Sequence, residues 1–156
     1  MTGQTKAHLD DLDKAILNLI QSSFPITPRP YAAVGAELGL SEEDVVTRVQ
    51  RLQQEGIIRR IGANFNSRRL GYTSTLCAAA VPPDQIDRFI AVVNRYPGVT
   101  HNYLRRHHLN VWFTLIAEST QQITAILEEM QTQSGIEKIY SFPAVRIFKI
   151  QVDFAL

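Results

Sequence analysis

The segment from residue 101 to residue 112 concentrates the side chains that could do chemistry. It holds three of the four histidines of the chain, its one tryptophan and two adjacent arginines. Histidine is the side chain that exchanges a proton near neutral pH, and the guanidinium group of arginine holds a carboxylate through two parallel hydrogen bonds. Together these residues could deliver a proton to a reacting group while they bind an anionic ligand.

The flanks of this segment predict a β-hairpin. Tyr96-Pro97-Gly98 is typical of a turn, residues 111–116 are β-branched and aromatic, and a tight loop would lie around His107 and His108. A loop with an even number of residues, centred between these two histidines, gives three opposed pairs: Tyr103 with Trp112, Arg105 with Asn110, and His101 with Thr114.

This register would give the hairpin two distinct faces, because directly opposed residues share a face. One face would carry His101, Tyr103, Arg105, Asn110 and Trp112. The other face would direct four apolar residues toward a core, with Asn102 alone out of place: Leu104, Val111, Phe113 and Leu115. A loop with an odd number of residues would turn one strand over and mix the two sets, so we favour the even loop.

The composition is that of a globular protein. The chain has 156 residues, 45% of them hydrophobic, enough for one ordinary domain or two small ones. A net charge of +1 indicates no general attraction to nucleic acid or membrane. The single cysteine, Cys77, cannot form an internal disulfide, residues 1–8 lack an apolar signal segment, and no later run is long enough to span a membrane. We therefore expect a soluble, cytoplasmic protein.

Three short helices are predicted in the first part of the chain. Apolar residues recur at steps of three and four over residues 9–19, which indicates an amphipathic helix. Residues 31–38 form a second short helix that Gly39 ends, and Ser41 caps a third helix.

A wing would follow the third helix, which is expected to end at Gly56. Residues 57–61 are isoleucine and arginine, and a polar turn covers residues 64–69. We therefore predict an N-terminal winged helix-turn-helix domain over residues 1–70, a fold whose usual function is DNA binding.

The acidic start of the third helix argues against that function. Its first residues, Glu42, Glu43 and Asp44, would have to face the phosphates of DNA. Up to Leu70 the chain has nine Lys and Arg against eight Asp and Glu, 9 − 8 = +1, whereas non-specific DNA affinity comes from neutralising many phosphates. We therefore do not expect this domain to bind DNA.

The rest of the chain, residues 71–156, predicts a domain that makes the whole protein α+β. The expected elements are a strand over residues 75–81, a helix over 83–95, the hairpin, a helix over 119–132 and a last strand over 136–154, interrupted at Pro143. The order βαββαβ is that of a ferredoxin-like unit, whose helices cover one sheet face. The other face must pack on something, and a twin subunit or a large flat ligand would both serve.

A helix-turn-helix joined to a βαββαβ domain resembles the Lrp/AsnC family of amino-acid-responsive transcription regulators over nearly the whole chain. Three motifs are closer to one branch of that family, the siroheme decarboxylases. They are Phe24-Pro-Ile-Thr-Pro-Arg-Pro-Tyr31, Arg60-Ile-Gly-Ala-Asn64, and His101-Asn-Tyr-Leu-Arg105 continued through His107 and Asn110 to Trp112-Phe113. His108 departs from the pattern and leaves open which loop histidine points at the ligand.

The resemblance implies a carboxy-lyase that removes the acetate carboxylates on rings C and D of siroheme. The product would be 12,18-didecarboxysiroheme, in alternative heme or heme d1 biosynthesis, and two similar subunits, A and B, would form a heterodimer. No cofactor is expected, because the siroheme iron belongs to the substrate. The alternative is an Lrp/AsnC-type transcription regulator that binds DNA and a small effector, an amino acid or heme, in the same sheet region.

The implied decarboxylation needs a general acid and several cations. The predicted catalytic residues are His101 as the acid, Tyr103 as its partner or an alternative donor, and Arg105. His107 or His108 could instead ligate the siroheme iron. The predicted substrate-binding residues carry groups that suit a carboxylate-rich ring: Arg29, Arg59, Arg60, Asn64, Arg106, His107, His108, Asn110, Trp112, Arg146 and Lys149.

Each of these residues also has a simpler interpretation. A strand histidine is more often a hydrogen-bonded structural residue, a loop histidine is more often only exposed, a single arginine is more often a solvated surface charge, and Trp112 could belong to the core. Their crowding on one hairpin favours the functional interpretation. A metal site built by the protein alone is not expected, because the three histidines have no cysteine or nearby carboxylate to complete a tetrahedral set.

Overall fold

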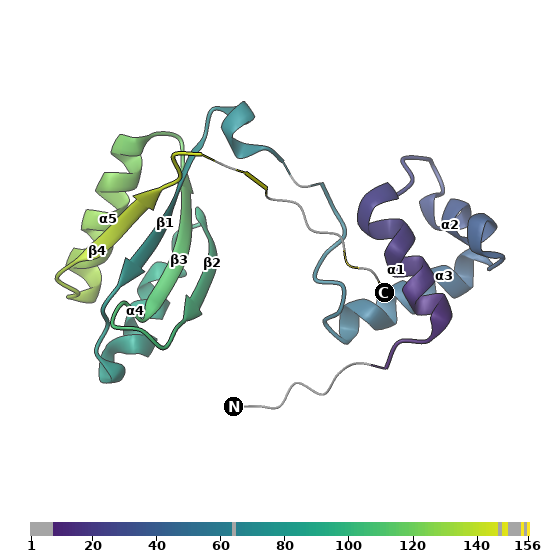
Figure 1. Cartoon of the computed structure of the whole chain (residues 1–156), viewed down its shortest axis with the longest axis horizontal. Helices are drawn as coiled ribbons and strands as arrows, with labels where there is room; N and C mark the ends of the chain where they lie inside the picture. The colour runs from purple at the N-terminus through teal and green to yellow at the C-terminus, as the bar shows by residue number, and fades with distance from the viewer. Residues whose placement is uncertain (1–7, 64, 147, 150–153, 155) are drawn as a thin grey trace. The chain divides into compact units, whose positions relative to one another are not determined.

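The computed structural model describes residues 8–63, 65–146, 148–149, 154 and 156, and the chain divides into two compact units (Figure 1). The helical unit comprises Met1–Ala63 and Lys149–Leu156, and the sheet unit comprises Asn64–Phe148. The sequence predicted the domain boundary after Leu70 and assigned the C-terminal residues to the second domain, residues 71–156. The structure groups these C-terminal residues with the helices.

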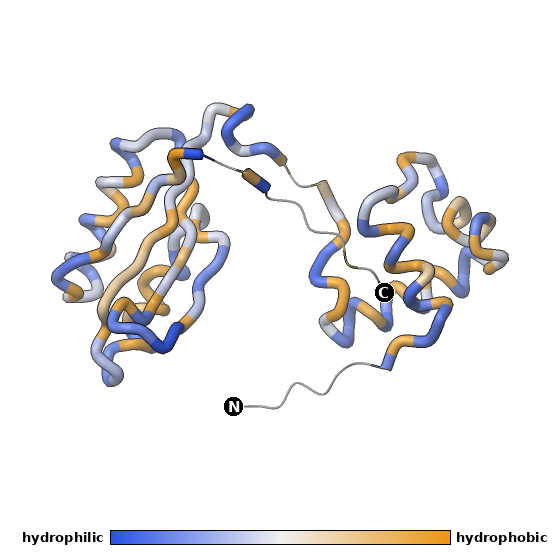
Figure 2. The backbone as a smooth tube through the Cα atoms, viewed as in Figure 1, coloured by the Kyte–Doolittle hydropathy of each residue, from blue (hydrophilic) through white to orange (hydrophobic). Residues whose placement is uncertain are grey.

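The helical unit contains the three predicted helices. They are α1 (Asp11–Ser23), α2 (Pro30–Leu38) and α3 (Glu42–Gln54). Capping boxes start α1 and α3: the side chains of Asp10 and Ser41 each accept a hydrogen bond from the backbone N–H three residues on. Gly39 ends α2 with a positive φ of 70°, which glycine adopts without steric cost. The hydrophobic stretches recur along each helix in Figure 2, and their buried members form one core.

The segment predicted to begin the wing, residues 57–61, starts as a turn at the end of α3. Residues 57–61 form no strand, because the backbone N–H groups of Ile57 and Ile58 both donate to the carbonyl of Leu52, at 2.9 and 3.0 Å. This turn closes the end of α3 and buries Ile58 in the helical core. The β-branched residues that suggested a strand therefore serve to cover the helices.

The sheet unit has the predicted βαββαβ order. Its elements are β1 (Thr73–Ala79), α4 (Ile86–Val93), β2 (Val99–Leu104), β3 (Val111–Ala117), α5 (Thr120–Ser134) and β4 (Ile139–Pro143), with short 3₁₀ helices at Ser67–Leu70 and Pro83–Gln85. The strands lie in the order β2-β3-β1-β4, and every neighbouring pair is antiparallel. The ferredoxin-like fold is confirmed.

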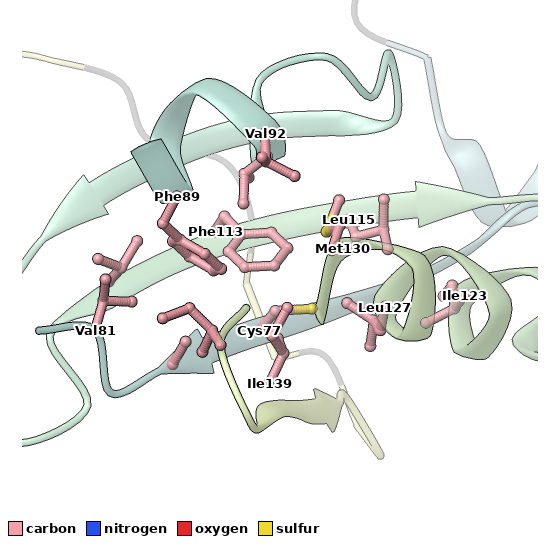
Figure 3. Close-up of a cluster of buried hydrophobic side chains, with 14 of the residues drawn as sticks. Cys77, Val81, Phe89, Val92, Phe113, Leu115, Ile123, Leu127, Met130 and Ile139 are labelled. Carbon is pink, nitrogen blue, oxygen red and sulfur yellow. The ribbon is translucent and has the colours of Figure 1, made fainter. Parts of the chain in front are cut away.

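One face of the sheet is covered by α4 and α5. Phe89 from α4 and Leu127 and Met130 from α5 pack against Cys77 of β1 and Phe113 of β3, all less than 7% exposed (Figure 3). Because strand residues alternate between faces, the intervening residues lie on the opposite face, which no helix of this unit covers. We call it the open face.

The last strand is shorter than predicted. β4 ends at Pro143, whose missing N–H cannot continue the ladder. Ala144 to Arg146, Phe148 and Lys149 are not in a strand, and the other residues of the predicted alternation, apart from Phe154, lie outside the described part of the chain.

A buried carboxylate joins α1 to α3. The side chain of Asp13 is 1% exposed and accepts hydrogen bonds from Arg48 at 2.8 Å and Arg51 at 2.6 Å, while Arg48 also donates to Asp10 at 2.7 Å. Burial alone would raise the pKa of Asp13, but the two arginines outweigh it and hold the pKa below its usual value.

Replacing Asp13 with Asn should lower the free energy of unfolding near neutral pH by about 2 kcal/mol, because two guanidinium groups lose their carboxylate. The folded-state pKa of Asp13 lies below 3.8. Its stabilisation is therefore present above that pH and lost as the pH falls through the folded-state value. Urea denaturation of the wild type and of Asp13→Asn, followed by far-UV circular dichroism over the acid range, measures both effects.

Asp11 provides the matched control for this substitution. Its side chain is fully exposed and pairs only with Lys14 among the described residues, at 3.3 Å. Asp11→Asn should leave stability nearly unchanged. An Asp13→Asn protein as stable as Asp11→Asn would show that the buried carboxylate does not hold the two helices together.

Candidate active site

The β2–β3 hairpin has the predicted register. His101 pairs with Thr114 and Tyr103 with Trp112. The N–H of Arg105 donates to the carbonyl of Asn110 at 2.7 Å, so these two residues also face each other across the start of the loop. The even loop is confirmed, and it places His101, Tyr103 and Trp112 on the open face.

The open face has a row of directly opposed residues at the hairpin-loop end of the sheet. We call it the first row: Tyr103 of β2, Trp112 of β3, Ala78 of β1 and Tyr140 of β4. Ala78 is fully buried although the helices lie on the other face. Its small side chain, between Trp112 and Tyr140, leaves room for the large rings on either side.

The second row lies next to the first along the strands and contains His101, Thr114, Leu76 and Phe142. His101 is exposed, and its Nδ1 lies 3.0 Å from the hydroxyl of Thr100. If that hydroxyl is the partner of Nδ1, Nε2 remains to meet a ligand. His101 is therefore placed one row from the aromatic residues, on the same face, where it could act on a bound molecule.

Arg105 lies above the aromatic residues of the first row. Its guanidinium carbon is 4.9 Å from the ring centre of Tyr103 and 5.0 Å from that of Trp112, and its Nη2 donates to the Tyr103 hydroxyl at 3.3 Å. These cation–π contacts hold the guanidinium in place. No acidic side chain pairs with Arg105 in the described part of the chain, so its charge can serve an anionic ligand.

The aromatic surface continues to β4 through residues that the sequence interpretation missed. Trp112 stacks on Phe142 with ring centres 5.9 Å apart, and Phe142 on Tyr140 at 6.2 Å. The ammonium of Lys138 lies 4.7 Å from the Tyr140 ring centre. Lys138, Tyr140 and Phe142 are spaced two apart, and this alternation before Pro143 is the sequence signal that places them on one face of a strand.

The two loop histidines differ in what they can do. The Nδ1 of His107 accepts a hydrogen bond from the backbone N–H of Leu109 at 3.2 Å. A neutral His107 in this arrangement carries its proton on Nε2, so it can donate that proton but offers no free lone pair to a metal. His108 lies against His107 with ring centres 4.3 Å apart and lines a cavity of about 550 Å³. His108 is therefore the better candidate for an iron ligand.

Asn110 was expected to present its side chain on the open face, but this side chain makes hydrogen bonds to the protein backbone. Its side-chain amide donates to the carbonyl of Val81 and accepts from the N–H of Val81, both at 2.8 Å. The side chain thus ties the hairpin to the segment after β1. Leu104, expected in the core, is 58% exposed because it is the last residue of an edge strand. Trp112 is half-buried, and its indole N–H donates to the Leu109 carbonyl at 2.7 Å.

Two more of the predicted substrate-binding residues in the sheet unit, Arg106 and Arg146, lie outside the two rows of the open face. Arg106 is exposed in the hairpin loop. Arg146, in the sheet unit, lies 4.8 Å from the ring centre of Phe148. Asn64 lies outside the described residues.

The other three arginines and Lys149 belong to the helical unit. Arg29 pairs with Glu42, so its charge is already partnered. Arg59 and Arg60 are exposed and line an apolar cavity of about 620 Å³. Lys149 is exposed.

Other kinds of chemistry find little support in this chain. Burial raises the pKa of Cys77 to about 12, so its thiol stays protonated and unreactive near neutral pH. Among the described residues, no group of three or more His, Cys, Asp or Glu side chains could hold a metal ion. The side chains of the open face supply groups for anion binding, ring stacking and proton transfer.

Two family models match the chain. The one described as "AsnC-like ligand binding domain" covers residues 69–149, and the one described as "Siroheme decarboxylase NirDL-like HTH domain" covers residues 13–59. The siroheme decarboxylase alpha subunit of Desulfovibrio desulfuricans is 51% identical over 150 residues, which is 96% of this chain and 86% of that protein. The chain belongs to the siroheme decarboxylase family. The family resemblance expected from the three motifs is confirmed.

Two further relatives match this chain over different shares of their own length. The siroheme decarboxylase NirG subunit of Paracoccus pantotrophus is 39% identical over 91% of this chain and 90% of its own. The crystal structure of the siroheme decarboxylase NirDL matches 92% of this chain with a TM-score of 0.64 and 30% identity, but this is 47% of the NirDL chain. This chain therefore spans about half the length of NirDL.

The fold is shared with regulators as well. The Mycobacterium tuberculosis leucine response regulatory protein matches 95% of this chain and all of its own with a TM-score of 0.80, at 20% identity. At that identity the likeness shows the fold alone.

No helix among the described residues is long and apolar enough to cross a membrane.

The contacts of Asn110 predict a structural effect of its replacement. Asn110→Ala should lower the free energy of unfolding by about 2 kcal/mol, because the N–H and carbonyl of Val81 lose both partners in a partly buried place. Urea denaturation of the wild type and the variant measures the change. Asn66, which caps an exposed 3₁₀ turn, provides a milder comparison. An unchanged urea midpoint in Asn110→Ala would show that the hydrogen bonds between Asn110 and Val81 contribute nothing to stability.

Proposed function

We propose that this chain is a siroheme decarboxylase subunit that removes the acetate carboxylates on rings C and D of siroheme and gives 12,18-didecarboxysiroheme. The observation that carries the proposal is the position of Arg105 over Tyr103 and Trp112, on the same open face as His101, in a chain of this family. A cation for carboxylates and an aromatic surface for a flat ring thus lie on the same face as the histidine that we propose as the proton donor. Such a product would serve alternative heme or heme d1 biosynthesis.

Binding would use the two properties of the macrocycle. The flat ring stacks on the aromatic side chains, and its peripheral carboxylates meet cations. Arg105 suits a carboxylate beside the one that leaves. A cation that held the leaving carboxylate itself would stabilise the ground state and slow its loss, whereas a neighbouring cation stabilises the charge that develops on the ring.

The reaction itself requires one proton for each CO₂. The bond between the acetate methylene carbon and its carboxylate carbon breaks, CO₂ leaves, and the electron pair remains on the methylene carbon, delocalised into the macrocycle. A proton then adds to that carbon and forms a methyl group. The macrocycle accepts the electrons within the substrate, so the proposed step uses no cofactor of the protein.

His101 is the proposed proton donor. Histidine is the side chain suited to proton transfer near neutral pH, and His101 lies on the open face one row from Tyr103 and Trp112. Tyr103 is the alternative donor, because its hydroxyl lies on the same face, at 3.3 Å from Arg105. For the siroheme iron, which arrives with the substrate, His108 is the proposed ligand.

The open face supports a second subunit. Phe142 is 44% exposed and Tyr103 39% exposed, so this face presents apolar area for a ligand and a second subunit to cover. NirDL has about twice the length of this chain, and other relatives carry the word subunit in their names. We propose a heterodimer with a related subunit that closes over the part of the open face beyond the substrate.

The proposed acid can be tested directly. His101→Ala in the complex with its partner subunit should still bind siroheme but lose about 10²-fold to 10⁴-fold in turnover, since the proton donor is gone. Anaerobic incubation with siroheme, followed by mass spectrometry, counts the CO₂ losses, and an absorbance titration measures binding. In D₂O the wild-type product should gain one deuterium at each new methyl group. His8→Ala, in the helical unit, is the control and should keep most of the turnover.

Three outcomes separate the parts of the proposal. Wild type that neither binds siroheme nor releases CO₂ would overturn the function. Full turnover by His101→Ala would overturn only the assignment of the acid and transfer it to Tyr103. Loss of binding in His101→Ala would make this residue a ligand anchor.

The helical unit is not expected to bind DNA. The first turn of α3 carries Glu42, Glu43 and Asp44, and its Arg48 and Arg51 are paired with carboxylates of the same unit. Few cations remain on this helix for phosphates. Gel-shift assays at low and physiological salt, with the DNA upstream of the protein's own gene and an unrelated duplex, should show no specific complex. A salt-dependent shift confined to one sequence would support the regulator.

A further inference from the structure

The open face carries a second cation that mirrors Arg105. Arg105 follows Tyr103 by two residues beyond the end of β2, and Lys138 precedes Tyr140 by two residues before the start of β4. The two-residue period places both on the open face, and each lies over a ring of the first row, at 4.9 and 4.7 Å. β2 and β4 are the two edge strands. The first row therefore ends in a cation on both edges of the sheet.

The surface between these cations is suited to a flat molecule. Four strands with three spacings of about 4.8 Å separate the edges by about 14 Å. Along this width the first row offers an aromatic ring on each edge strand, Trp112 on β3 and the small Ala78 on β1. Phe142 of the second row stacks on both Trp112 and Tyr140 and joins them into one surface.

Lys138 has a free charge and space around it. It is exposed, and no acidic side chain forms an ion pair with it in the described ranges. The cavity of about 550 Å³ at this end of the sheet is lined by Lys138, Tyr140, His108 and Glu137. Glu137 is the acid closest in sequence, and it would oppose an anion there. The cavity can take a side chain that extends beyond the ring edge.

We propose that Lys138 is a second carboxylate anchor for the tetrapyrrole, opposite Arg105, and that Tyr140 and Phe142 complete the stacking surface. The proposal rests on the proposed function. One anchor would let a nearly square ring turn in its plane. Two anchors on opposite edges fix which peripheral acetates face His101, so Lys138 sets orientation as well as affinity.

The test compares three variants in the complex with the partner subunit. Lys138→Ala removes the anchor, Lys138→Arg keeps the charge, and Glu137→Gln changes the adjacent exposed residue. Anaerobic absorbance titrations with siroheme give Kd, and turnover assays give KM and kcat. Circular dichroism checks that each variant is folded.

Lys138→Ala should raise Kd and KM about tenfold, the loss expected for one charge-assisted contact. It should also produce a mixture of singly decarboxylated isomers where the wild type gives one. Lys138→Arg should restore both values, and Glu137→Gln should bind as tightly as the wild type or more tightly. Wild-type Kd and a single isomer in Lys138→Ala, alongside normal wild-type turnover, would overturn the Lys138 assignment and leave the decarboxylase function intact. No binding by the wild type would overturn both.

Iron porphyrins identify the carboxylate. Iron-uroporphyrin carries acetates and propionates, whereas iron-coproporphyrin carries propionates alone. An anchor for a propionate would make Lys138→Ala weaken both complexes, and an anchor for an acetate would weaken only the first. Equal binding of both porphyrins to Lys138→Ala and wild type would again overturn the assignment.

Discussion

The register of the β2–β3 hairpin is the constraint on which the site depends. Strand side chains alternate with a period of two, so a slip of β2 by one residue would turn His101 and Tyr103 toward α4 and α5 and separate them from Trp112 on β3. Asn110 secures this register, because both hydrogen bonds of its amide go to the backbone of Val81 beside the end of β1. A residue whose side-chain amide bonds to the backbone of Val81 thus determines which side chains a ligand can meet.

The fold leaves a single face for chemistry in the sheet unit. The helix-covered face is packed with residues that are almost fully buried. On the open face, the buried Ala78 allows Trp112 and Tyr140 to lie on either side of it, and Phe142 joins them by stacking. The cations then rest on rings whose positions the sheet already fixes. This arrangement is preorganised, since little side-chain freedom remains to be lost when an anion binds.

Much of this could be predicted from the sequence. The alternation of polar and apolar residues, together with an even loop, predicted the opposed pairs of the hairpin. A register shifted by one residue would have turned one strand over, which would bury Arg105 or expose Phe113. The failures have physical causes as well. The isoleucines of residues 57–61 favour a strand by propensity, but in the structure they pack against the helical core. Strand propensity carries no information about such packing between distant parts of the chain. An asparagine that holds a hairpin in place cannot be told from one that binds a ligand by its residue type. Only its hydrogen-bond partner, here the backbone of Val81, distinguishes the two roles. Lys138 and Tyr140 come near the hairpin only through pairing between β1 and β4, which no local pattern encodes.

The helical unit keeps the helices of a helix-turn-helix but carries acidic side chains at the start of its third helix. A helix-turn-helix reads DNA with a cationic, exposed third helix. Here Arg48 and Arg51 of α3 turn toward Asp10 and Asp13 of α1, and the first turn of α3 is acidic. The arginines therefore hold two helices together, which makes them unavailable to phosphates without breaking a buried contact. Shared architecture with regulators is consequently a weak guide to function, whereas the side chains that the architecture presents to solvent are a strong one.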